Sequence, residues 1–111
     1  MDLKKYKVNP ECMGGAMVTK SLLEGTSELK WFYRENPVDQ QDNGWRAIGD
    51  TDTQEYIDEP SNSVIVDFNS LIQIEPAVLS ICHLPVGTEL ELKRVGKELH
   101  FIDLKTGNII P

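Results

Sequence analysis

Hydrophobic and polar positions alternate most regularly toward the C-terminal end of the chain, in two runs over residues 89–95 and 98–104. A period of two residues is that of a β-strand with one face buried and the other in water. The dipeptide Gly96-Lys97 separates the two runs and favours a tight turn. The pattern therefore predicts a β-hairpin. Its candidate inward-facing residues are Leu90, Leu92, Leu99 and Phe101.

Four earlier segments have the apolar, aromatic or β-branched composition of strands. They span residues 16–20, 28–34, 45–48 and 63–68. In the second of these, Leu29, Trp31 and Tyr33 are predicted to share one face, because side chains alternate along a strand. The last segment is rich in Val and Ile without alternation, which predicts a strand in the interior of the sheet.

Helical signals are shorter and weaker. A helical turn is predicted over residues 53–57, capped by Asp50 or Thr51 and ended by Pro60. A second helical region is expected within residues 71–82, where Pro76 fits the first turn of a helix. The elements together predict an α+β domain with a mainly antiparallel sheet of about six strands, two short helices and a C-terminal β-hairpin.

The length of the chain, 111 residues, suits one domain with a single core. Residues 1–13 are polar, basic in patches and interrupted by Pro10, so we expect an N-terminal arm there. Residues 14–111 are expected to form the single α+β domain.

The segment from Asp39 to Asn62 is strongly polar, with seven acidic residues and one basic residue, Arg46. We expect it to contribute little to the core and to form a long surface connection, and long loops often carry function. We predict that this segment binds a partner. The candidate partner-binding residues are Asp39, Asp42, Trp45, Arg46, Asp50, Asp52, Glu55, Tyr56 and Asp58.

Three of these candidates also have structural alternatives. Trp45 is either a core anchor of its strand or an exposed contact residue. Arg46 either braces the segment, by pairing with an acid such as Asp50, Asp52 or Asp58, or reaches a partner. Tyr56 can cover the rim of the core with its ring while its hydroxyl faces water, an arrangement that is favoured at interfaces.

The charge balance restricts the partners. Lys and Arg total 11 against 18 Asp and Glu, a formal net charge of -7. Such a chain repels nucleic acid and anionic membranes and attracts basic partners. The sequence contains no run of about 18 apolar residues and no hydrophobic run near its start, so we expect a cytoplasmic protein.

The residue types needed for common site chemistry are present without the required spacing. Two Cys and two His do not form ligand pairs, and Cys82 and His83 are adjacent, which disfavours zinc. The run Asp50 to Gln54 lacks the central Gly of a calcium loop, and no Gly-x-Ser-x-Gly nucleophile elbow occurs. We therefore expect no metal ion, no cofactor and no enzymatic activity, and two reduced thiols as the default for a cytoplasmic chain.

Several short blocks occur in an order and spacing that are characteristic as a set. They are Ala16-Met17-Val18-Thr19-Lys20, Tyr33-Arg34-Glu35-Asn36-Pro37, Asp42-Asn43-Gly44-Trp45-Arg46, Gly49-Asp50, Glu55-Tyr56-Ile57-Asp58, Pro60-Ser61-Asn62, Val66-Asp67-Phe68-Asn69-Ser70-Leu71-Ile72 and Leu84-Pro85-Val86-Gly87-Thr88-Glu89-Leu90-Glu91. Over roughly residues 14 to 92 this arrangement resembles a small bacterial family, immunity protein thirty-three, which is classed among the immunity proteins of polymorphic toxin systems. The resemblance implies toxin neutralisation and supplies no catalytic residues.

Two functions of different class follow. The first is a binding protein that neutralises a cognate bacterial toxin, such as a basic nuclease, by occluding it through the acidic segment; a basic cleft that accepts the phosphate backbone would also attract an acidic surface. The alternative is a small-molecule-binding or regulatory domain, or a cryptic enzyme, that uses a pocket between sheet and helix.

Overall fold

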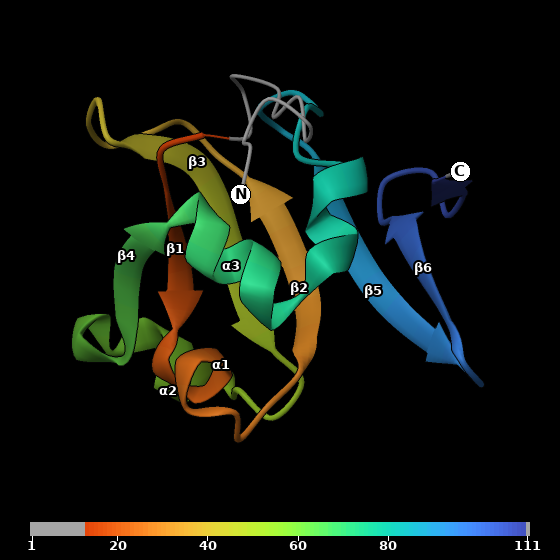
Figure 1. Ribbon diagram of the computed structural model, residues 1–111, viewed down its shortest axis with the longest axis horizontal. Helices are drawn as coiled ribbons and strands as arrows, with labels where there is room; N and C mark the ends of the chain where they lie inside the picture. Colours follow the sequence, from red (N-terminus) through yellow and green to blue (C-terminus); the bar gives the residue numbers. More distant parts are fainter. Residues whose placement is uncertain (1–12, 111) are drawn as a thin grey trace, which may run out of the picture.

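A computed structural model describes residues 13–110, so the expected N-terminal arm lies, apart from Met13, outside the described residues. Its centre is a seven-stranded sheet in the order β4-β1-β3-β2-β5-β6-β7 (Figure 1). The strands are β1 (Gly15–Thr19), β2 (Leu29–Arg34), β3 (Asp42–Gly49), β4 (Ser63–Asp67), β5 (Glu89–Val95), β6 (Glu98–Asp103) and β7 (Ile109–Ile110). All neighbouring strands are antiparallel except β1 and β3, which are parallel. The predicted α+β class is confirmed, with one strand more than expected.

The helical segments are short and lie around this sheet. They are α1 (Lys20–Glu24), α2 (Gln54–Asp58), α3 (Phe68–Ile74) and the 3₁₀ segments η3 (Pro60–Asn62) and η4 (Pro76–Ser80). In Figure 1, α3 lies across one face of the sheet, while α1 and α2 lie near one end of β1 and β3. Thr53 caps α2 by accepting a hydrogen bond from the Tyr56 N–H, so the expected cap at Asp50 or Thr51 is wrong. The region from Pro76 folds as a 3₁₀ segment rather than an α-helix.

The core fills the space between the sheet and the α3–η4 region. Phe68 and Leu71 of α3 and Val78 of η4 are buried against inward side chains of the strands. The largest of these is Trp45, which is fully buried, stacks on Phe32 with ring centroids 4.2 Å apart, and donates its indole N–H to the Cys82 carbonyl at 3.0 Å. Burial of the ring with its one polar atom satisfied stabilises the packing of the sheet against this region.

Two strands differ from the sequence prediction in a way that side-chain pattern explains. β4 is an edge strand rather than an interior one, because it pairs only with β1. Val64 and Val66 pack on the core while Ile65, between them, is 41% exposed; an apolar residue on the outer face concealed the alternation. In β2, a register shift between Leu29 and Trp31 places Leu29 in the core with Phe32, so Leu29 does not share the face of Trp31.

The segment that was expected to be a long surface connection contains β3, which confirms the strand predicted over residues 45–48 but begins earlier and lies between β1 and β2 in the sheet. Most residues of β3 are buried, including the charged residues Asp42 and Arg46. The expectation failed because polarity was taken as a sign of exposure, whereas oppositely charged residues can be buried when they pair with each other.

The C-terminal hairpin has the predicted form, with β5 and β6 joined at Gly96-Lys97. Leu92 pairs directly with Phe101, and Leu90, Leu92 and Phe101 are all buried. Leu99 lies nearer the turn and is 39% exposed, so its expected inward position is wrong.

The hairpin packing gives a stability prediction. Leu92→Ala and Phe101→Ala should each lower the free energy of unfolding by about 2 to 5 kcal/mol, because each leaves a cavity under the sheet. Urea denaturation followed by Trp fluorescence measures the loss. Leu99→Ala is the matched control on the same hairpin and should cost less than about 1 kcal/mol. Equal losses for Leu99 and Leu92 would contradict the assigned inward face.

Candidate functional site

Arg46 is the most constrained charged residue of the acidic segment. Its side chain is 3% exposed, and its guanidinium forms a bidentate pair with Asp42, with Nη1–Oδ1 and Nη2–Oδ2 distances of 2.8 and 2.7 Å. Its Nε donates to Glu35 Oε1 at 2.6 Å. The expected pairing of Arg46 with Asp50, Asp52 or Asp58 is therefore wrong: its partners are Asp42 and Glu35.

Contact between Asp42 and Arg46 requires an irregular strand. In a regular strand, residues four apart are separated by roughly 13 Å. Here the pairs Gly15–Asp42 and Met17–Arg46 show that four steps along β3 oppose only two steps along β1. Gly44 lies within this irregularity with φ +92°, and a Cβ there would collide with the Glu35 carbonyl. The irregularity brings the carboxylate and the guanidinium together.

This pair also shifts both pKa values. The hydrogen bonds from Arg46 hold the pKa of Asp42 well below its usual range, against the opposing effect of burial. The same hydrogen bonds raise the pKa of Arg46 above its ordinary value. Asp42 further accepts the N–H groups of Val38 and Gly44, which fixes the connection between β2 and β3. Both residues stabilise the fold from inside.

The acids that follow β3 lie at its other end. Asp52 is half-buried and accepts hydrogen bonds from the Ser21 hydroxyl at 2.5 Å and the Gly49 N–H at 2.7 Å. Ser21 also contacts the Ser27 hydroxyl at 2.7 Å, so this network joins α1 to the turn after β3. Asp50 is exposed and accepts the Glu28 N–H.

Helix α2 carries the remaining predicted residues. Glu55 and Asp58 are exposed, and Tyr56 is half-buried. Asp58 accepts a hydrogen bond from Gln54 across one turn of the helix. No ion pair within residues 13–110 involves the five acids from Asp50 to Glu59, and no Lys, Arg or His occurs between Asp50 and Asn62.

The nine predicted partner-binding residues therefore separate into three groups. Asp42, Trp45 and Arg46 are buried, and Trp45 is a core anchor. Asp39 is exposed but lies before β3, where it accepts the Gln41 and Asp42 N–H groups. The remaining five follow one another along the chain, in the turn after β3 and in α2, and we name this group the acidic surface. It comprises Asp50, Asp52, Glu55, Tyr56 and Asp58.

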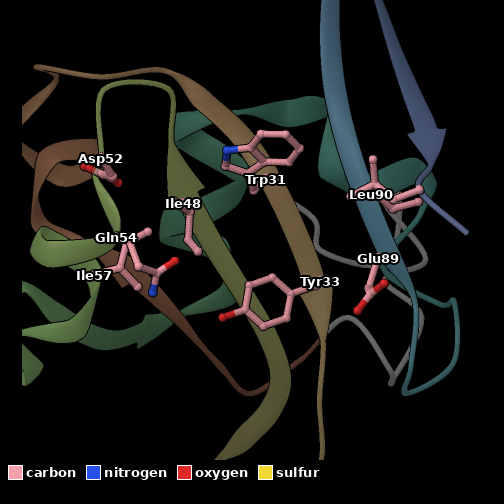
Figure 2. Close-up of a pocket in the computed structure, with 9 residues that line it drawn as sticks. Trp31, Tyr33, Ile48, Asp52, Gln54, Ile57, Glu89 and Leu90 are labelled. Atoms are coloured by element: carbon pink, nitrogen blue, oxygen red, sulfur yellow. The ribbon is translucent and has the colours of Figure 1, made fainter.

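Sequence reasoning missed a hollow beside the acidic surface, which we name the sheet groove. It lies on the sheet face opposite α3, between α2 and β5, and has a volume of about 510 Å³ (Figure 2). Its lining residues are Trp31, Tyr33, Ile48, Asp52, Gln54, Ile57, Glu89, Leu90 and Leu104. The alternation of Trp31 and Tyr33 was visible in the sequence, but only the fold shows that no described helix covers their face beyond α2 at its margin.

A smaller hollow of about 180 Å³ adjoins the sheet groove and shares Tyr33, Ile48 and Ile57 with it. Arg46 and Glu35 also line it. Burial, with a further contribution from Glu35, raises the pKa of Tyr33 above 10.0, while Arg46 opposes the rise. Tyr33 is therefore a neutral phenol at physiological pH and can donate a hydrogen bond.

Within residues 13–110, no three His, Cys, Asp or Glu side chains converge as a metal site would require. None of the described helices has the length and apolar character needed to span a bilayer. Cys82 is disulfide-bonded, so the expectation of a reduced thiol is wrong at this position, and Cys12 lies outside the described residues.

Comparison with known proteins defines the class. The model of the Immunity protein Imm33 domain matches residues 16–102, which include β2 to β5 and all but one residue of each of β1 and β6. The chain therefore belongs to the Imm33 family of immunity proteins, which confirms the resemblance seen in the sequence blocks. No curated protein and no solved structure matches it.

The buried ion pair predicts a specific acid response. Because the pKa of Asp42 is depressed in the folded state, its contribution to stability is present above its ordinary pKa of 3.8 and is lost as the pH falls below that value. Asp42→Asn should cost about 3 kcal/mol at neutral pH, since it leaves the Arg46 charge buried without its main partner. Below pH 4, the variant should lose stability less steeply than the wild type in urea denaturation.

Glu35→Gln is the matched control, because Glu35 binds the same guanidinium but its side chain is 53% exposed. Its loss should cost less than about 1 kcal/mol. A parallel pH dependence for wild type and Asp42→Asn would contradict the depressed pKa, and equal costs for the two variants would contradict the dominant role of the buried pair.

Proposed function

We propose that this protein neutralises a cognate bacterial toxin by binding it directly, with the acidic surface covering a basic functional region of the toxin. Membership of the Imm33 family supports the immunity role and a toxin partner. The observation that supports this mode of binding is the set of acidic residues after β3. They project from one turn and one short helix without an ion pair to any described residue.

Unpaired surface carboxylates favour a basic partner for two reasons. The field of several like charges attracts an oppositely charged surface before contact and raises the association rate. On contact, each acid can gain a partner without first breaking an internal ion pair. Glu55 and Asp58 fit this role best, because Asp52 already binds Ser21 and Gly49 and has a structural function.

A nuclease is the toxin class that we infer from this charge. Nucleases that act on a phosphate backbone need Lys and Arg around their substrate, so an acidic surface can occupy the same region. The net charge of -7 acts in the same direction, because it favours a basic protein and disfavours nucleic acid itself as the ligand of this chain. Occlusion of the toxin before it reaches its substrate completes the proposed function.

The acidic surface is tested by reversing charges that have no internal ion pair. The variant Glu55→Lys with Asp58→Lys should slow association with the toxin by about tenfold at low salt and flatten the salt dependence of the rate, because steering is lost. The product of the neighbouring gene, as the candidate toxin, is co-purified with the chain, separated, and used in stopped-flow binding across a salt series.

The matched control is Asp67→Lys with Glu98→Lys, which changes the net charge by the same amount at exposed positions on β4 and β6. Its association rate should stay within about twofold to threefold of the wild type, since charges beyond a Debye length are screened. Circular dichroism checks the fold of both variants. An unchanged rate and salt slope in the folded Glu55 and Asp58 variant would place the binding site elsewhere.

A further inference from the structure

The sheet groove combines an apolar floor with acidic walls. Trp31 and Tyr33 from β2 and Ile48 from β3 form the floor, and Ile57 of α2 closes one side (Figure 2). Glu89 of β5 stands on the other side. The volume of about 510 Å³ exceeds that of a single side chain and is within the range of ligand-binding hollows.

Glu89 is the polar group of the groove that is most available to a ligand. Its carboxylate makes no hydrogen bond or ion pair with another residue in the described part of the chain, and it is exposed. Asp52, at the α2 side, adds a second negative charge although its oxygens already accept two hydrogen bonds. The lining of the groove, within residues 13–110, contains no Lys, Arg or His.

The cationic side chains close to the groove already interact with other residues of the chain. The guanidinium of Arg46, in the adjoining hollow, donates four hydrogen bonds, to Asp42, Glu35 and the Trp45 carbonyl. Lys30 places its Nζ 5.1 Å from the centroid of the Trp31 ring. Lys30 itself lines a separate hollow formed with Glu28, Asp50 and part of β5.

We propose that the sheet groove binds a long basic side chain, lysine or arginine, presented by the partner protein. The aliphatic stem lies along Tyr33 and Trp31, and the cationic head pairs with Glu89. This inference rests on the proposed function in one respect: the partner that presents the side chain is the toxin bound by the adjacent acidic surface. The groove supplies an anchor, while the acidic surface supplies steering.

The chemistry of the groove favours this occupant over others. Lysine and arginine carry an apolar stem and a charged head, which match an apolar floor with an acidic wall. A purely apolar side chain would cover Glu89 without offering it a hydrogen bond, which is costly. An anion such as a phosphate would be repelled by Glu89 and Asp52. The aromatic floor adds a cation–π attraction for the head or its neighbouring carbons.

A peptide titration tests the groove without the toxin. Acetyl-Gly-Arg-Gly-amide and acetyl-Gly-Lys-Gly-amide are added at millimolar concentration to isotopically labelled wild-type protein. We expect saturable shifts of the Trp31 indole N–H resonance and of the Ile48 and Ile57 methyl resonances. The neutral analogues, with citrulline in place of arginine and norleucine in place of lysine, should bind at least about threefold more weakly, because the cationic head is removed.

Variants of single carboxylates locate the head group. Glu89→Gln keeps the shape of the side chain and should lower the affinity for the arginine peptide by about threefold, to the affinity that the wild type has for the citrulline peptide. The control Glu98→Gln removes an exposed acid that pairs with His100 on β6, outside the groove, and should leave peptide affinity unchanged. The amide spectrum of each variant checks that the fold is retained.

The outcomes separate the groove from the proposed function. Equal binding of charged and neutral peptides, no shift of the groove resonances, or an equal effect of Glu89→Gln and Glu98→Gln would each overturn the inference. If the basic peptides bind as expected while the reversal of Glu55 and Asp58 leaves toxin association unchanged, the groove stands and the proposed acidic surface fails. If the reversal of Glu55 and Asp58 slows toxin association while the basic peptides do not bind as expected, the proposed acidic surface stands and the groove fails.

Discussion

A positive charge buried in the middle of the sheet is the constraint on which this structure depends. Arg46 lies on β3, between β1 and β2, with almost no exposure to water. A buried ion is tolerated only when a partner and further hydrogen bonds replace its hydration. Asp42 supplies the partner, Glu35 and the Trp45 carbonyl supply the remaining acceptors, and the irregularity at Gly44 gives the geometry. The connection between β2 and β3 is fixed by the same carboxylate.

Because neighbouring side chains on a strand point to opposite faces, this arrangement gives β3 two different surfaces. Trp45 and Ala47 face the α3–η4 region and belong to the core. Arg46 and Ile48 face the other side, where α2 covers only the margin of the sheet. One face is therefore closed by packing, and the other retains a hollow with an aromatic floor beside a group of unpaired acids.

The acids of the segment after residue 39 have different roles according to whether they are satisfied internally. Asp42 is neutralised by Arg46, and Asp52 is held by Ser21 and Gly49, so both hold elements in place. Glu55 and Asp58 do not hold elements in place in this way, and the one side-chain contact of the two is a hydrogen bond that Asp58 accepts from Gln54 within residues 13–110. Membership of an immunity-protein family implies a cognate toxin partner, and outward charges of this kind attract an oppositely charged surface.

The sequence by itself determined the α+β class, the C-terminal hairpin, the strands over β1 and β2 and the family, because these depend on local periodicity, turn residues and the order of short blocks. It also marked Trp45 as a possible core anchor. Only the tertiary structure decided that β3 is a central strand, that β4 is an edge, and that Arg46 pairs with Asp42 and Glu35. Whether a charge can be buried depends on which oppositely charged residue the fold brings next to it. The sheet groove depends on which face of the sheet the helices leave uncovered. Neither is encoded in the polarity of a single segment.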